Sequence, residues 1–170
     1  MRLLSESTVE LFAEYGLTVT FSAFEKPDLP MTDPSLAGVI GFSHTSIRGS
    51  LTLLMEKKMV SMTRLTAVGA DESDTAQQDW MAELANQLLG RKKNKMLRYS
   101  TTLGMSTPTV ISGKSITISP PRSRDARWLK FSAASGVLHV LCDCGVREGL
   151  ELTLLDSHES VSAEGDLLLF

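Results

Sequence analysis

The sequence has few cysteines and histidines, with only two and three respectively. Its only two cysteines, Cys142 and Cys144, stand at i and i+2 of an apolar run, so they share one face of a strand. His139 is near them in the sequence, but zinc usually takes about four ligands and no second cysteine–histidine cluster exists. We therefore expect reduced thiols and no metal site. The isolated histidines His44 and His158 do not indicate a catalytic role.

Long apolar runs and extended basic segments are also missing. No apolar run approaches the roughly 20 residues needed to cross a bilayer. The first 16 residues lack the long apolar stretch and cleavage site of a signal peptide, so we expect a cytoplasmic protein with no membrane partner. The net charge is −3, and the only basic cluster is RKKNK at 91–95, so nucleic acid is not an expected partner.

The residues that are present suit one α/β domain. A chain of 170 residues with 42% apolar content can bury a sizeable core, and we expect a single domain over residues 1–170. Helices are predicted in SESTVELFAEYG, with a serine cap and Gly16 as its stop, at about 57–69, and from about Gln77 to Leu97. Strands are predicted over 17–26, in two hairpins, and in the stretch that follows Pro108.

The two predicted hairpins define the fold class. The first covers about 38–55, with a polar loop ending in Gly49, and the second is RWLKFSAASGVLHVLCDC, with a turn at Gly136. Their likeness is one of pattern and leaves a duplication open. Helices that alternate irregularly with largely antiparallel strands favour a two-layer α/β sandwich over a doubly wound parallel sheet. SGKS at 112–115 does not predict a nucleotide-binding loop, because Pro108 replaces the upstream glycine.

The helix in DWMAELANQLLG, residues 79–90, has an unusual polar side. At about 100° per residue, Asp79, Glu83, Asn86 and Gly90 form a narrow stripe. Opposite them lies a broad apolar arc of Trp80, Met81, Leu84, Ala85 and Leu88. A solvated face is the ordinary explanation of such a stripe, but asparagine and glycine are poor helix formers. The stripe therefore faces water or a partner, and its residues indicate a requirement other than helix stability.

This stripe belongs to a longer pattern. The motif D-x-x-x-E-x-x-N of Asp79, Glu83 and Asn86, with Gly90 and the distant Pro108 in GMSTPTVISG, resembles the CheC/CheX family of chemotaxis phosphatases. VIGFSHTSIRGSLTLLM is similar to the family's paired strands and DESDTAQQDWMAELANQLLG to its catalytic helix, so about residues 35–120 are covered. The 21 residues between Asn86 and Pro108 are one fewer than in the family pattern.

The first helix sets the chain apart from part of that family. CheC-like members carry two active helices, but here Ala13 stands three residues after Glu10, where an asparagine would be needed. One active helix makes the chain most similar to CheX. The resemblance implies the corresponding two-layer fold and a homodimer. The runs SGVLHVLCDCG and GSLTLLM are candidates for the dimer interface if they are edge strands, and they would equally suit buried central strands.

The resemblance also implies an activity. The chain would hydrolyse the aspartyl phosphate of a CheY-like response regulator, with Glu83 and Asn86 as catalytic residues and Asp79, Gly90 and Pro108 in binding roles. Glu83 would pair with the regulator's lysine. No cofactor is expected in this chain, because the regulator itself holds Mg²⁺ at the phosphoryl group. An asparagine amide accepts one hydrogen bond and donates another, so Asn86 can position the attacking water.

Two other functions stay open at this point. A noncatalytic module that keeps the docking helix and binds a receiver domain without turnover is the main alternative. A generic sensory or structural domain is the third. The sequence does not separate them from the phosphatase, because an exposed acidic and amide stripe serves docking and catalysis equally well.

Overall fold

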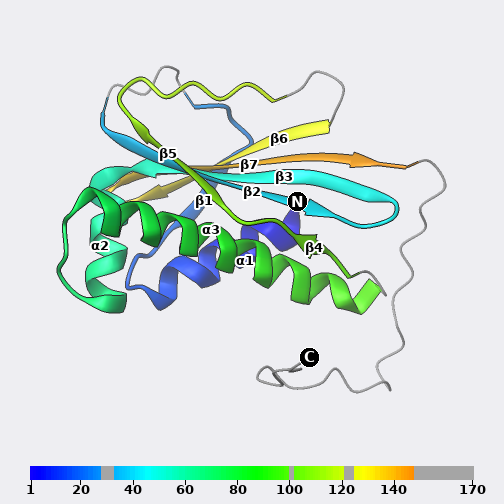
Figure 1. Ribbon diagram of the computed structural model, residues 1–170, viewed down its shortest axis with the longest axis horizontal. Coiled ribbons are helices and arrows are strands. Elements are labelled where there is room, and N and C mark those ends of the chain that lie inside the picture. Colours follow the sequence, from blue (N-terminus) through cyan, green and yellow to red (C-terminus); the bar gives the residue numbers. More distant parts are fainter. Residues whose placement is uncertain (28–32, 100–101, 121–124, 148–170) are drawn as a thin grey trace.

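The structure of the protein is a computed structural model that describes residues 1–27, 33–99, 102–120 and 125–147 (Figure 1). In chain order its elements are α1 (Arg2–Glu14), β1 (Thr20–Ala23), β2 (Ser35–Ser43), β3 (Ile47–Glu56), α2 (Lys57–Val68), α3 (Asp74–Met96), the short 3₁₀ turn η1 (Leu97–Tyr99), β4 (Gly104–Met105), β5 (Thr109–Gly113), β6 (Asp125–Ala133) and β7 (Gly136–Val146).

The strands form one sheet and the helices form a second layer on one of its faces (Figure 1). The sheet has seven strands in the order β1-β6-β7-β3-β2-β4, with β5 also paired to β2, and every pairing is antiparallel. This confirms the predicted two-layer α/β sandwich. In the part of the chain that is described, no helix has the length and apolarity needed to cross a membrane.

The two predicted hairpins form the centre of the sheet. β2 pairs with β3, β6 pairs with β7, and β3 and β7 join the hairpins side by side. The runs GSLTLLM and SGVLHVLCDCG are therefore central strands, so their use as edge strands at a dimer interface is wrong. Burial on both faces explains their nearly continuous apolar composition.

The sequence pattern predicts that Gly49 ends the loop of the first hairpin, and this prediction is wrong. The connection between β2 and β3 comprises residues 44–46, and Gly49 is paired with Phe42 and Cys144 inside the sheet. A Cβ atom at Gly49 would lie 2.0 Å from the backbone oxygen of Asp143. A glycine required by such a close approach gives the same sequence signal as a glycine required by a turn.

α1 begins earlier than its sequence signals predicted. The expected serine cap in SESTVELFAEYG is wrong, because the helix starts at Arg2. Leu4 is 1% exposed, so burying it adds a turn to the apolar face ahead of the serines. The predicted stop is confirmed: Gly16 has a φ of 71°, and the N–H of Leu17 donates to the carbonyl of Phe12 at 2.9 Å.

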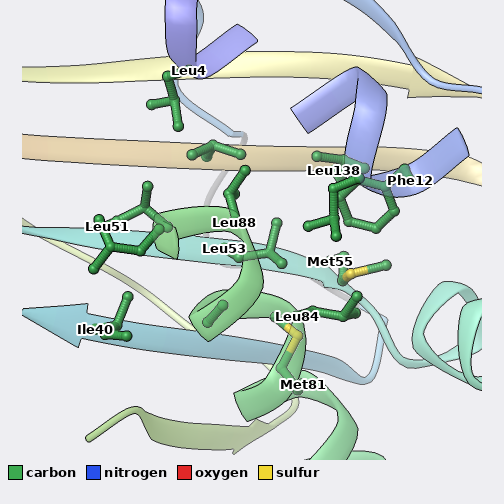
Figure 2. Close-up of a cluster of buried hydrophobic side chains, with 14 of the residues drawn as sticks. Leu4, Phe12, Ile40, Leu51, Leu53, Met55, Met81, Leu84, Leu88 and Leu138 are labelled. Atoms are coloured by element: carbon green, nitrogen blue, oxygen red, sulfur yellow. The ribbon is translucent and has the colours of Figure 1, made fainter. Parts of the chain in front are cut away.

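The main core lies between the sheet and the helices. Figure 2 shows side chains of the central strands packed against side chains of α1 and α3. The strands contribute Leu51, Leu53, Met55 and Leu138, and the helices contribute Phe12, Met81, Leu84 and Leu88. The opposite face of the sheet carries a smaller cluster of Ala37, Leu54, Ile116, Trp128 and Leu141. Full burial of one such side chain contributes about 1.5–3 kcal/mol. The larger cluster is therefore what holds the helices against the sheet.

One contact sets how closely α3 approaches the sheet. A Cβ atom added to Gly38 of β2 would lie 3.0 Å from the Cβ of Ala85 and 3.0 Å from the backbone oxygen of Met81. A glycine therefore faces an alanine where the helix crosses the strand, and the two backbones meet with almost no side chain between them. Any larger residue at Gly38 must push α3 outward.

Gly38→Val tests this contact. We expect overpacking to lower the free energy of unfolding by about 1–3 kcal/mol, measured by urea denaturation. Gly113→Val on the neighbouring strand β5 is the matched control, because a Cβ atom there meets no atom within 4 Å. The control should change stability by no more than about 0.5 kcal/mol. Equal stability of the two variants would contradict a close helix–strand contact at Gly38.

Candidate functional site

The candidate site lies on α3, and several side-chain contacts fix where this helix begins. The Ser73 side chain accepts a hydrogen bond from the N–H of Ala76 at 3.2 Å. The Asp71 carboxylate accepts one from the N–H of Ser73 at 2.9 Å, and this bond lowers the pKa of Asp71. Lys57 of α2 pairs with Asp74 at 2.5 Å. These contacts let the helix begin at Asp74, a few residues before the predicted Gln77.

The predicted division of α3 into two faces is confirmed. All five residues of the apolar arc are buried, namely Trp80, Met81, Leu84, Ala85 and Leu88. Asp79, Glu83 and Asn86 are exposed, and Gly90 is partly exposed. A Cβ atom added to Gly90 would meet no atom within 4 Å. The helix surface around Gly90 is therefore open to the backbone or side chains of another molecule.

α2 holds the N-terminal half of α3 in place. The indole N–H of Trp80 donates to the hydroxyl of Thr63 at 3.0 Å, and the Gln77 amide donates to the Ser61 hydroxyl at 3.0 Å. Trp80 and Gln77 are 7% and 4% exposed, so both bonds lie largely out of water. A groove between the two helices runs beside Asp79, Trp80 and Glu83. The acidic end of the stripe thus lies next to a hollow surface.

α1 holds the C-terminal half of α3 through charge pairs. Lys95 binds the Glu10 carboxylate at 2.8 Å, and Arg91 pairs with Glu14. These contacts engage two of the four cations in the only basic cluster of the sequence. Lys92 instead lies 5.0 Å from the centre of the Phe42 ring. These three side chains of the cluster therefore contribute to packing between α3 and the elements beside it.

Gln87 and Tyr15 also contribute to the site, although the sequence patterns do not predict it. The Gln87 amide donates to the Glu83 carboxylate at 2.7 Å, and the Tyr15 hydroxyl donates to the other end of the Gln87 amide at 2.6 Å. The spacing i, i+4 between Glu83 and Gln87 is a signal that could have indicated the first bond. Tyr15 lies 72 residues from Gln87, and no local pattern predicts that contact.

Pro108 lies at the edge of the sheet, in a break between β4 and β5. Thr109 is paired with Val39 and Met105 with Phe42, so three residues face two residues of β2 across this break. Such a bulge tolerates proline, which has no N–H to offer the ladder. β5 contacts α3, which brings this segment beside the motif helix. The contacts of the described residues do not include a hydrogen bond between Pro108 and the stripe.

The two cysteines share the helix-facing side of β7. Cys142 is buried, with the Lys92 ammonium 3.4 Å from its sulfur, and burial raises the pKa of the half-buried Cys144. His139 points to the other face, where its ring packs edge-on to Trp128. Within the described ranges, no group of three His, Cys, Asp or Glu side chains could hold a metal ion. His158 lies outside the described residues.

The fold that carries this site is shared with chemotaxis proteins of known structure. A CheC-like superfamily protein from Shewanella sp. PV-4 has a TM-score of 0.74 at 22% identity, covering 84% of this chain and 95% of that chain. The chemotaxis protein CheX from Vibrio vulnificus has a TM-score of 0.74 at 19% identity, covering 85% and 97%. CheX in the CheX–CheY–BeF₃–Mg²⁺ complex from Borrelia burgdorferi has a TM-score of 0.61 at 15% identity, covering 86% and 97%. The fold is thus that of the CheC-like chemotaxis proteins.

The family itself follows from the sequence. The family model for the chemotaxis phosphatase CheX matches residues 36–132, which is more than half of the chain. The chain belongs to the CheX family. The matched range contains the whole stripe of α3 together with Pro108. Curated protein sequences give no match to this chain.

Proposed function

We propose that this protein dephosphorylates the aspartyl phosphate of a CheY-like response regulator. The observation that carries the proposal is the exposed stripe of Asp79, Glu83, Asn86 and Gly90 on α3 of a CheX-family fold. The CheX–CheY complex from Borrelia burgdorferi supports the choice of partner, because a protein of the same fold is bound there to a CheY. The activity belongs in the cytoplasm with such regulators, and cell fractionation would check that location.

Asn86 is the residue that positions the attacking water. Hydrolysis of an aspartyl phosphate needs a water molecule in line with the leaving carboxylate, and the regulator's own Mg²⁺ and lysine stabilise the phosphoryl charge. The Asn86 amide is exposed in the middle of the stripe and can accept a hydrogen bond from that water while donating another. It brings no charge of its own toward an anionic phosphoryl group. Its contribution is therefore orientation of the nucleophile.

Glu83 is the residue that docks the helix. It lies one turn before Asn86 on the same face, and its carboxylate can pair with the regulator's lysine. Asp79 adds a second negative charge one turn earlier, and Gly90 leaves the next turn open for close approach. Pro108 supports this surface from the β4–β5 break beside α3.

The direct test is the decay of a phosphorylated CheY-like receiver domain with and without the purified protein. We expect the protein to accelerate loss of the phosphoryl group at substoichiometric concentration. Binding without acceleration would instead favour the noncatalytic receiver-binding module. Failure to bind every receiver in a panel would favour a sensory or structural domain.

Alanine substitutions should separate the two catalytic residues. Glu83→Ala should weaken receiver binding, because it removes the carboxylate that pairs with the lysine. Asn86→Ala should leave binding largely intact and lower the maximal dephosphorylation rate by roughly 10²-fold, or about 2.7 kcal/mol of barrier. Titration calorimetry and single-turnover decay measure the two effects. Both sites are exposed, so each variant should unfold within about 0.5 kcal/mol of the wild type.

Gly90→Ala gives opposite expectations for stability and binding. Alanine is the better helix former and its Cβ meets no neighbour, so the free energy of unfolding should rise by about 0.5–1 kcal/mol. The same methyl group would lie in the path of the regulator and should weaken binding roughly 10-fold. Gln78→Ala, at an exposed position of the same helix, is the control and should change neither. Unchanged binding by the Gly90 variant would remove close approach from its role.

We also propose that the protein is a homodimer, as the family resemblance implies. The central position of β3 and β7 leaves the outer strands, or the face of the sheet opposite the helices, as possible contact surfaces. Sedimentation at micromolar concentration should give twice the chain mass of 18.5 kDa. A monomer at that concentration would end this part of the proposal.

A further inference from the structure

A chain of hydrogen bonds runs from α1 to the stripe. The Gln87 Nε2 atom donates to Glu83 Oε1 at 2.7 Å, and Gln87 Oε1 accepts from the Tyr15 hydroxyl at 2.6 Å. The directions follow from the chemistry of the groups. An ionised carboxylate can only accept, so the amide must present its NH₂ group to Glu83 and its oxygen to Tyr15. The tyrosine hydroxyl is then obliged to donate.

The far end of this chain is anchored in the packing of all three helices. Tyr15 is the C-terminal cap of α1, and its ring packs edge-on to Trp80 of α3 with centroids 5.0 Å apart. Trp80 is itself tied to Thr63 of α2 by the indole hydrogen bond of 3.0 Å. The Tyr15 hydroxyl therefore has a defined position before any partner arrives, and Gln87 transmits that position to Glu83.

We propose that Gln87 is a positioning residue that, held by Tyr15, orients the Glu83 carboxylate for docking to the regulator. The inference rests on the proposed function and assigns two residues outside its motif. An exposed glutamate loses side-chain freedom when it binds, and a carboxylate that is already oriented loses less. No interaction of the described residues occupies Glu83 Oε2, so that oxygen remains available to a lysine. Because the amide is neutral, the carboxylate also keeps its full charge.

The test uses Gln87→Leu and Tyr15→Phe. Each substitution breaks the hydrogen-bonded connection from Tyr15 to Glu83 but keeps a side chain of similar size. Tyr15→Phe also retains the ring that packs against Trp80. With a CheY-like receiver carrying beryllofluoride as the phosphoryl mimic, we expect the Kd to rise by about 2- to 12-fold for each variant. The dephosphorylation rate at saturating protein should stay at the wild-type value, because Asn86 is untouched. Gln78→Leu, at an exposed position of the same helix, should leave the Kd unchanged.

Double variants distinguish positioning of Glu83 from a purely structural role of Gln87 and Tyr15. If Gln87 acts through Glu83, then Gln87→Leu added to Glu83→Ala should not raise the Kd beyond that of Glu83→Ala alone. Tyr15→Phe combined with Gln87→Leu should likewise match either single variant. Additive losses in both double variants, or a wild-type Kd in stably folded single variants, would overturn the inference and leave the proposed function standing.

A measurement on the protein alone, with no receiver present, tests the positioning of Gln87 independently of the proposed function. In the wild-type protein, ¹⁵N relaxation of the Gln87 side-chain amide should report an ordered group, and Tyr15→Phe should make it mobile on the picosecond to nanosecond timescale. If the wild type neither binds nor dephosphorylates any receiver, the function fails and so does the docking role of the chain. A mobile Gln87 amide in the wild type would contradict the positioning itself, whatever the activity.

Discussion

The close contact between α3 and β2 is the constraint on which the rest of the site depends. With Gly38 facing Ala85 and the backbone of Met81, the helix cannot rotate or withdraw without opening the core. A rotation by one residue, about 100°, would carry the stripe toward the sheet and bring buried leucines to the surface. The packing of α3 against the sheet therefore determines which of its side chains are exposed. Glu83 and Asn86 are presented because the opposite face of α3 is fully committed to packing.

A site of this kind has no need of a deep cleft. In the proposed reaction the regulator brings the phosphoryl group, the metal ion and the lysine, so this chain has to supply only correctly placed groups. Placement on a long helix held at Trp80 by α2 and at Lys95 by α1 suits that task, because a helix is stiffer than a loop. The exposed Glu83 carboxylate is the part of this arrangement that helix packing alone does not orient. The Tyr15–Gln87 chain extends the rigid packing out to that carboxylate.

Local periodicity predicted much of the fold and of the stripe. The 3.6-residue pattern of α3 separated Trp80 and Leu84 from Glu83 and Asn86, because burial of one helix face is a local property of the sequence. Features that depend on contacts between distant segments escaped prediction. The local pattern places Gly49 at a turn, whereas its constraint is the backbone of β7. The pattern also leaves the two apolar runs open between edge and central positions, because strand order is not encoded locally. The bond from Tyr15 to Gln87 is hidden for the same reason.

The two acidic residues Glu10 and Glu83 show how one residue type can take different roles in the two helices. Both carboxylate oxygens of Glu10 accept hydrogen bonds from Lys95, at 2.9 and 2.8 Å, so this glutamate is engaged by a cation of its own chain. Ala13 stands three residues later, where α3 has Asn86 after Glu83. Glu83 is instead held at one oxygen by a neutral amide, which fixes its direction without compensating its charge. A cation supplied by a partner can therefore still be attracted to Glu83, whereas at Glu10 it would have to displace Lys95. The contrast agrees with the proposed docking surface on α3 and with a structural role for Glu10 of α1.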